Sequence, residues 1–499
     1  MDSNAPFKQF SRQSKKGIIV IYLNLLYKVL KAFWVFLFIF IQKFSKISET
    51  KLLYIYLGLG MLLLFLLFRA FLVFKNFQYK IENNHFILKS GILKKTNTSI
   101  PFDRIQNINF KQNLIQQFIN VFEVNIETAG SSKAEISIKA LSFKEANTLK
   151  NSITVHENNT INLEVSSEQK PLLKINFLQL LKVSLTENHL QSLLLLFAIL
   201  MGFFQQISEL FKGFGKREVL EDYISENTTS LGNNILLIIV FFFVLILVSV
   251  ISSIVRVYLR HFNLTVFVKN NALEIYQGLT TKKSILLKKE KVQHITVSHN
   301  PIKKKLGISF ITFKQAISGK VKKKQDKIIK IVGCGHEQVS AIKNFLFLNE
   351  NFDNNIKNHS HQYFKLRLYF RSFLFLLILN TALYISFETP LFFLVNVFLI
   401  PLSIALITVK FKKRYYFFTN EILIIGSGTI ETHKTYLPFF KVQNVTLKQT
   451  FFQAKNKVID LIFQTASGKI KIPCIQEKEA FKMYDYALFK VQTSTKSWM

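Results

Sequence analysis

Three copies of one sequence pattern organise this chain of 499 residues. The clearest copy runs from Tyr79 to Ile108, and its spacing of an Asn, a Gly and a Gln returns twice further along. The three sets are Asn83, Gly91 and Gln106; Asn270, Gly278 and Gln293; and Asn420, Gly428 and Gln443. A repeat limits the fold more than any single motif, because each copy must form the same supersecondary unit. We therefore expect three related domains.

The apolar residues of the repeat predict a β-hairpin. They keep the same distance from the Gly in every copy, at Phe86, Leu273 and Leu423 before it and at Ile100, Leu287 and Leu437 after it. Since side chains two residues apart share one face of a strand, these positions define a constant inner face. The Gly is expected to take a positive φ between strands, and the Asn suits a turn in the left-handed region. The Gln has two open interpretations: it satisfies backbone groups at a barrel edge, or it meets a ligand.

Long runs of Leu, Ile, Val and Phe separate the repeats and predict transmembrane helices. The net charge is +35, from 65 Lys and Arg against 30 acidic residues. Beside membrane spans, this excess is typical of cytoplasmic segments and of attraction to anionic lipid. Nucleic acid is not expected as a partner, because the lysine-rich stretch Lys320–Lys330 has no aromatic residue on which a base could stack. Cys334 and Cys474 are too few for a disulfide framework and fit a reducing compartment.

The resulting fold class is an α+β membrane protein in which three transmembrane helical hairpins are each followed by an antiparallel β-barrel with a C-terminal helix. The predicted divisions are a basic N-terminus with the first hairpin (1–76), domain 1 (77–155), a linker (156–175), an interfacial helix with the second hairpin (176–260), domain 2 (261–349), a linker (350–365), the third hairpin (366–411) and domain 3 (412–499). In the first hairpin, an interfacial helix over Gly17–Leu30 is expected to lead into a membrane segment near Ala32–Ile41. The connection 208–233 is acidic and is placed outside the cell, so the domains face the cytoplasm.

The repeat resembles the bacterial membrane-anchored pleckstrin-homology proteins of the YdbT-like family. Domain 1 carries the resemblance best, at Tyr79, Asn83, Gly91, Ile100, Pro101, Arg104, Ile105 and Gln106. Domain 3 keeps most of these residue types but has Lys441 where domain 1 has Arg104, and domain 2 diverges most, with Val266 in place of the Tyr. The resemblance implies tandem pleckstrin-homology (PH)-like domains, each after a pair of membrane helices. It implies no activity, and it suggests a shorter homologue with a single PH-like domain as a partner.

The sequence contains no recognisable set of catalytic residues. A nucleophile with its base, paired carboxylates, metal ligands and a phosphate-binding loop are all missing at usable spacing. Cys334 and His336 are close, but no second pair completes a zinc site. We therefore expect a protein that is not an enzyme and that uses no cofactor and no metal.

Lysines of domain 2 form the predicted functional surface. They are Lys282, Lys283, Lys303, Lys304, Lys305, Lys322, Lys323 and Lys324. Their simplest interpretation is a solvated cytoplasmic face, and their functional interpretation is contact with anionic lipid. The expected function is a non-catalytic scaffold in the cytoplasmic (inner) membrane. The alternative is a transporter or lipid-handling permease, which would require polar residues in the middle of the spans.

Overall fold

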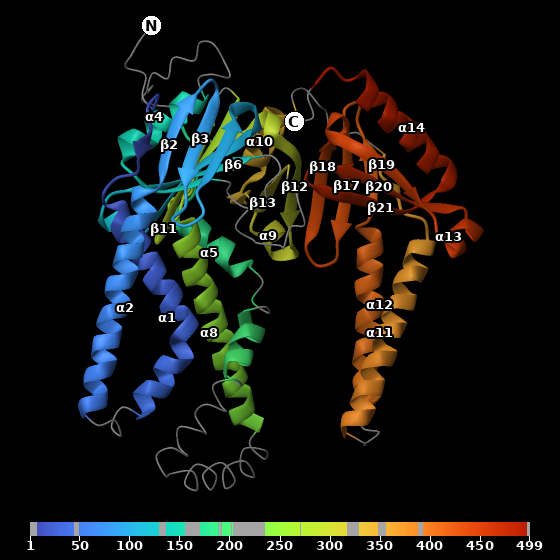
Figure 1. Ribbon diagram of the computed structural model, residues 1–499. Coiled ribbons are helices and arrows are strands. Elements are labelled where there is room, and N and C mark those ends of the chain that lie inside the picture. The colour runs from blue at the N-terminus through green and yellow to red at the C-terminus, as the bar shows by residue number, and fades with distance from the viewer. Residues whose placement is uncertain are drawn as a thin grey trace.

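The computed structural model describes residues 7–43, 49–128, 136–154, 170–187, 189, 192–200, 202, 235–269, 271–316, 329–347, 356–387 and 393–496. Its strands form one layer, and the long apolar helices all leave that layer on the same side (Figure 1). Blue, yellow-green and red colours follow one another across the layer, so the three repeats lie in a row in chain order.

Each repeat supplies six strands, one short helix and one C-terminal helix. Domain 1 contains β2 (Gln78–Glu82), β3 (His85–Ser90), β4 (Thr96–Pro101), β5 (Ile105–Asn113), α3 (Leu114–Phe118), β6 (Phe122–Thr128), β7 (Ile136–Leu141) and α4 (Phe143–Thr154). Domain 2 contains β9 (Thr265–Lys269), β10 (Ala272–Gln277), β11 (Thr281–Lys288), β12 (Val292–His299), α9 (Pro301–Lys305), β13 (Ser309–Gln315), β14 (Ile329–Cys334) and α10 (His336–Leu346). Domain 3 contains β16 (Tyr415–Phe418), β17 (Ile422–Gly428), β18 (Thr432–Pro438), β19 (Val442–Lys448), α13 (Phe451–Lys455), β20 (Val458–Thr465), β21 (Gly468–Gln476) and α14 (Glu477–Thr493).

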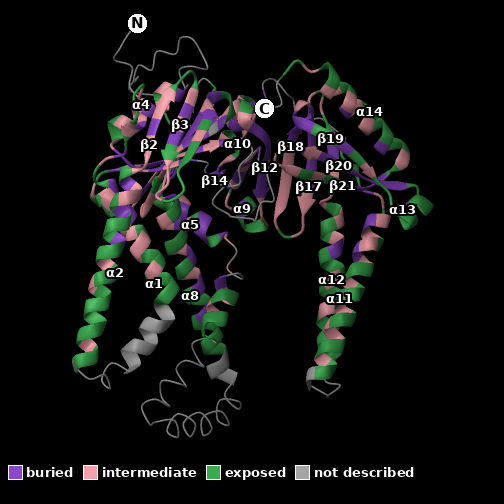
Figure 2. Cartoon of the chain, in the orientation of Figure 1, coloured by how far each residue is buried: buried purple, intermediate pink, exposed green. Residues whose placement is uncertain are grey.

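The inner face predicted from the repeat is confirmed. Phe86, Leu273 and Leu423 are fully buried, and their strands pair with the strands that carry Ile100, Leu287 and Leu437. Purple, buried positions accordingly concentrate in the strand layer (Figure 2). Helix α4 begins with a capping box, because the Ser142 N–H donates to the Glu145 carboxylate at 2.9 Å and the Glu145 N–H donates to the Ser142 hydroxyl at 3.3 Å.

A short strand before each apolar helical section pairs with the first strand after that section. These strands are β1 (Ser11–Arg12), β8 (Leu173–Lys174) and β15 (Asn358–His359). Ser11 pairs with Tyr79, Leu173 with Val266 and Asn358 with Tyr416, which is the same repeat position each time. The chain therefore starts each domain, leaves it through the membrane helices and returns to it. The sequence-based boundaries had assigned two of these strands to linkers.

Helix α5 (Phe177–Leu185) covers domain 2. Its Leu180 and Val183 are buried in the core of that domain, and the Val183 side chain lies where a Cβ on Gly333 would touch it. Phe177 and Leu178 stay exposed. The apolar face that was predicted to lie in a membrane interface is thus partly used to complete domain 2.

Four helices are long and apolar enough to cross a membrane in the part of the chain that the structure describes. They belong to α2 (Glu49–Lys75), α8 (Ile235–His261), α11 (Tyr363–Phe387) and α12 (Val395–Lys412). Helix α1 (Gly17–Lys43) is continuous through both predicted segments and packs against α2, with Ile21 beside Ala70 and Phe74. Within the predicted second hairpin, residues 192–200 and 202 of the first apolar run are described as helical, whereas the acidic connection 208–233 lies outside the described residues.

The sequence predicted three separate β-barrels, and the structure does not contain them among the described residues. Strands β4 and β5 of domain 1 lie in different sheets, and β5 continues into the sheet of domain 2 in the order β7-β6-β5-β11-β10-β9-β8. In the same way, β12 of domain 2 continues into domain 3 in the order β14-β13-β12-β18-β17-β16-β15. The domains are therefore joined by backbone hydrogen bonds, and their sheets do not close on themselves.

Candidate membrane-facing site

A short helix follows the fourth strand of every domain at the same repeat position. Each begins at a polar cap, since Asn113 accepts from the Gln116 N–H at 2.9 Å, Asn300 accepts from the Lys303 N–H at 2.7 Å, and Thr450 takes part in a capping box with Gln453. The signal for these helices is present in the sequence as a cap residue followed three positions later by Gln116, Lys303 or Gln453. It places α3, α9 and α13 in equivalent positions.

The short helices lie on the side of the strand layer where the membrane helices begin and end. Figure 1 shows this for α9 and α13. For α3, the Gln117 amide donates to the Leu279 and Thr280 carbonyls at 3.1 and 3.2 Å, and the Leu279 N–H in turn donates to the Leu259 carbonyl at the end of α8. Helix α9 touches the equivalent turn of domain 3, whose Thr429 and Ile430 carbonyls accept from Lys413 just after α12.

Exposed apolar residues and lysines occupy this side together. We call this set the juxtamembrane surface: Leu93, Phe118, Ile302, Ile430, Phe451 and Phe452 with Lys94, Lys95, Lys304, Lys305, Lys455 and Lys457. Phe118 and Phe451 are 94% and 82% exposed. Large apolar side chains that stand this free of the protein beside cations are typical of a surface that meets a lipid interface.

Five of the eight lysines of the predicted surface are described, and they lie on two different elements, β11 and α9. Lys304 and Lys305 are exposed on α9 and belong to the juxtamembrane surface. Lys282, which is exposed, and Lys283 lie on β11, where their backbone positions are opposite Gln112 and Lys111 of domain 1. Lys322, Lys323 and Lys324 lie outside the described residues.

Lys303 points into the protein and cannot contribute to a lipid-facing surface. Its side chain is 4% exposed, and its ammonium lies 2.7 Å from the Glu431 carboxylate of domain 3 and 3.7 Å from the centre of the Phe310 ring. Lys330 stands over the same ring at 4.3 Å. A buried ammonium requires a paired charge, so this lysine joins domains 2 and 3.

The three glycines of the repeat motif have a structural role, because their backbone conformation and close contacts leave no room for a side chain. Gly91, Gly278 and Gly428 have φ of 111°, 106° and 119°, and an added Cβ would overlap the carbonyl oxygens of Lys94, Thr281 and Glu431. The prediction for the asparagines is confirmed only at Asn83, whose φ is 48°, since Asn420 is not among the positive-φ residues and Asn270 lies outside the described residues.

The three glutamines do not share one environment. Gln293 is buried on β12, which lies between two strands, whereas Gln443 is exposed on β19, which lies at a sheet edge. The side chain of Gln106 is outside the description. No single ligand contact therefore explains the motif at both described positions.

His294 lies in the contact between domains 2 and 3. Its Nδ1 is 3.0 Å from the Ser467 hydroxyl, in the turn between β20 and β21. Burial, with a smaller effect of the Lys314 charge, lowers the pKa of His294 to about 4. The imidazole is therefore neutral at neutral pH in the folded protein.

Stability of the contact between domains 2 and 3 is expected to fall as the pH decreases from about 6.5 to about 4. In that window the unfolded chain binds a proton at His294 that the folded chain does not, at a cost of up to about 1.4 kcal/mol per pH unit. Thermal unfolding at pH 7 and pH 5 measures this difference. The decrease in unfolding temperature from pH 7 to pH 5 should be smaller in the H294Q variant and unchanged in H336Q, which replaces an exposed histidine. An unchanged pH dependence in H294Q would contradict the assignment.

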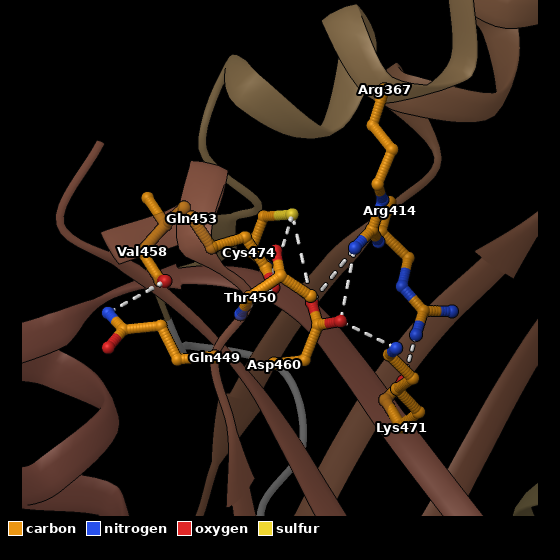
Figure 3. Close-up of polar contacts among 9 residues, drawn as sticks. All are labelled: Arg367, Arg414, Gln449, Thr450, Gln453, Val458, Asp460, Lys471 and Cys474. Atoms are coloured by element: carbon orange, nitrogen blue, oxygen red, sulfur yellow. Dashed lines mark hydrogen bonds and ion pairs between the residues drawn. The ribbon is translucent and has the colours of Figure 1, made fainter. Parts of the chain in front are cut away.

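A buried carboxylate attaches the third hairpin to domain 3 (Figure 3). Asp460 accepts from Arg367 at 3.0 Å, from Lys471 at 2.6 Å and from the Cys474 N–H at 2.8 Å. Arg367 belongs to α11, and Arg414, just after α12, donates to the Lys471 carbonyl. Burial raises the pKa of Asp460, but these hydrogen bonds and the Arg367 charge lower it more, so it lies below its ordinary value.

The hydrophobic base of the same hairpin is also fixed. Phe364, Leu368 and Ile407 pack against Val458 and Cys474 of domain 3. Both cysteines are free and buried. Among the described residues, no group of three or more His, Cys, Asp or Glu side chains could hold a metal ion.

The comparisons with known proteins identify the class. Matches to the bacterial PH domain family cover residues 26–155, 229–346 and 373–488, which is more than half of the chain. The chain therefore belongs to the bacterial PH domain family, and the resemblance found in the sequence is confirmed.

One curated relative aligns with this chain over nearly the whole length of both proteins. The chain is 23% identical over 463 residues to the UPF0699 transmembrane protein YdbT of Bacillus subtilis (strain 168), and the alignment covers 88% of this chain and 91% of that protein. With the apolar helices, these matches make the chain a membrane protein with tandem PH-like domains.

Proposed function

We propose that this protein is a non-catalytic membrane scaffold whose domains contact anionic lipid through the juxtamembrane surface. The observation that carries the proposal is the threefold repetition of a short helix with exposed apolar side chains, on the side where the membrane helices leave. The proposed arrangement has six membrane helices in three hairpins in the cytoplasmic membrane, with the domains in the cytoplasm.

Two forces act at such a surface. Apolar side chains gain free energy when they leave water for the acyl boundary, at about 25 cal/mol per Å² of buried area. Each lysine near an anionic leaflet contributes about 1 kcal/mol, screened by salt. Because the membrane helices already attach the chain, these contacts orient the domains against the bilayer.

The permease alternative gains little from the polar residues of the spans. Asn380 of α11 lies within the third hairpin, and Asn396 is the second residue of α12. Their amides pair with each other at 3.1 and 2.6 Å. Paired amides of this kind hold membrane helices together. Since each amide is satisfied by the other, this pair is explained without a transported substrate.

Lipid contact is tested with the full chain in nanodiscs. An environment-sensitive dye on the I302C variant should shift to shorter wavelength in discs that contain phosphatidylglycerol, compared with pure phosphatidylcholine. Native Cys334 and Cys474 are buried, so labelling is selective. The K304Q/K305Q change in the I302C background should remove about 2 kcal/mol of attraction and most of the lipid-dependent shift.

The control is a dye on the F489C variant. Phe489 is exposed near the C-terminal end of α14, and that end lies on the far side of the strand layer from the membrane helices (Figure 1). This dye should not respond to lipid. Equal spectra for the I302C dye in both lipids would refute the anionic-lipid proposal.

A further inference from the structure

The two junctions between domains use the same strands in the same register. At the first, β5 pairs antiparallel with β11, and Asn109 lies opposite Ile285. At the second, β12 pairs antiparallel with β18, and Thr296 lies opposite Thr435. Asn109 and Thr296 occupy one repeat position, and Ile285 and Thr435 occupy another. One geometry therefore joins domain 1 to domain 2 and domain 2 to domain 3.

Side chains reinforce each junction at matching places. Asn107 exchanges amide hydrogen bonds with Gln315 of domain 2 at 2.6 and 3.0 Å, and His294, at the same repeat position as Asn107, contacts Ser467 of domain 3. The hydroxyls of Thr296 and Thr435 are 3.2 Å apart across the second junction. Cross-strand pairs of this kind add to the backbone hydrogen bonds.

The two strands that form such a junction also occur as sheet edges, one in the first domain of the row and the other in the last. Strand β19 is the counterpart of β5 and β12, and it ends the sheet β19-β20-β21. Strand β4 is the counterpart of β11 and β18, and it ends the sheet β1-β2-β3-β4. Thr446, Asn444, Asn97 and Ser99 on these strands are exposed. Within the described residues, no strand pairs with either outer edge.

We propose that copies of this chain associate head to tail, with β19 of one copy pairing with β4 of the next as β5 pairs with β11 and β12 with β18. The register of the existing junctions places Thr446 opposite Thr98 and Val445 opposite Ser99. This inference goes beyond the proposed lipid contact and does not depend on it.

Two observations select a second copy of the chain as the occupant. Thr446 and Thr98 hold the repeat positions of Thr296 and Thr435, so the new junction would repeat the threonine pair of the second junction. All long helices leave the layer on one side (Figure 1), and the same junction repeated between copies keeps every copy in one bilayer. Unpaired strand edges otherwise promote uncontrolled association, and a heterologous contact of this type builds a ring or a filament.

Disulfide crosslinking tests the register. Membranes that contain T446C and T98C chains together, oxidised with copper phenanthroline, should give a product of twice the chain mass, and membranes with either chain alone should not. The T296C/T435C variant reports the existing junction as a positive control, through a disulfide within one chain. The matched control T446C with N97C should crosslink poorly, because adjacent residues of a strand point to opposite faces.

Charge changes test the contact without oxidation. The T446K/T98K chain should be reduced to single copies in native-membrane nanodiscs counted by mass photometry, and T446E/T98K should restore the larger assemblies. Single copies of the wild-type chain, or a T446C chain that crosslinks only to a different PH-domain protein, would overturn self-association. Loss of assembly with an intact lipid-dependent dye shift would separate this inference from the proposed function.

Discussion

The Asp460→Ala change is expected to lower the free energy of unfolding of domain 3 by about 3 kcal/mol. Removing this carboxylate leaves the Arg367 guanidinium next to domain 3 without its main partner and the Cys474 N–H without an acceptor. The cost comes mostly from the charge that remains partly buried, since Lys471 is exposed enough to be solvated again. Thermal unfolding of the full chain in detergent measures the loss.

Local opening provides a second readout of the same variant. Cys474 is buried beside Asp460 and packs against the base of the third hairpin, so its reaction with a thiol reagent should become faster. The matched control is Asp485→Ala on the exposed surface of α14, which should change stability by no more than about 0.5 kcal/mol. If both variants unfolded at the wild-type temperature, the carboxylate would not be the attachment point of the hairpin.

The Gly428→Ala change is expected to cost about 2–5 kcal/mol. The backbone at φ 119° is strained for any residue with a Cβ, and that Cβ would overlap the Glu431 carbonyl. The same turn carries the Glu431 carboxylate that pairs with Lys303 and the carbonyls that accept from Lys413. A shift of the turn therefore weakens both the contact with domain 2 and the attachment of α12.

Gly468→Ala isolates the overlap from the backbone strain. Gly468 has nearly the same φ, 123°, but an added Cβ there would meet no atom within 4 Å. This variant should lose only about 1 kcal/mol, the cost of strain alone. Unfolding midpoints together with hydrogen exchange in the turn between β17 and β18 compare the two. Equal losses in both variants would show that the overlap contributes nothing.

Local sequence patterns were sufficient to predict the strand faces, the turns and the apolar helices of this protein. The positions of Phe86, Leu273 and Leu423 fixed the inner face because strand periodicity is a property of neighbouring residues. Gly91, Gly278 and Gly428 marked the turns because only Gly takes such φ values at low cost. The runs within α2, α8, α11 and α12 were found because length and hydropathy alone predict membrane helices.

The arrangement of those units came only from the tertiary structure. The strands before the hairpins have two residues each, too few for a periodic pattern, and their partners lie beyond the membrane helices in sequence. Lys303 resembled its neighbours Lys304 and Lys305 until Glu431 of the next domain was placed beside it.

The position of a strand at the centre or at the edge of a sheet explains why residues at the same repeat position differ in burial. Gln293 and Gln443 hold the same repeat position, yet one is buried and the other exposed, because β12 has a following domain to pair with and β19 has none. Three repeated domains and four apolar helices could be predicted from the residue pattern alone, since both depend on local periodicity and hydropathy. The strands that join one domain to the next could be identified only in the folded chain, because their backbone donors and acceptors are the same at every residue except proline and leave no signature in the side chains.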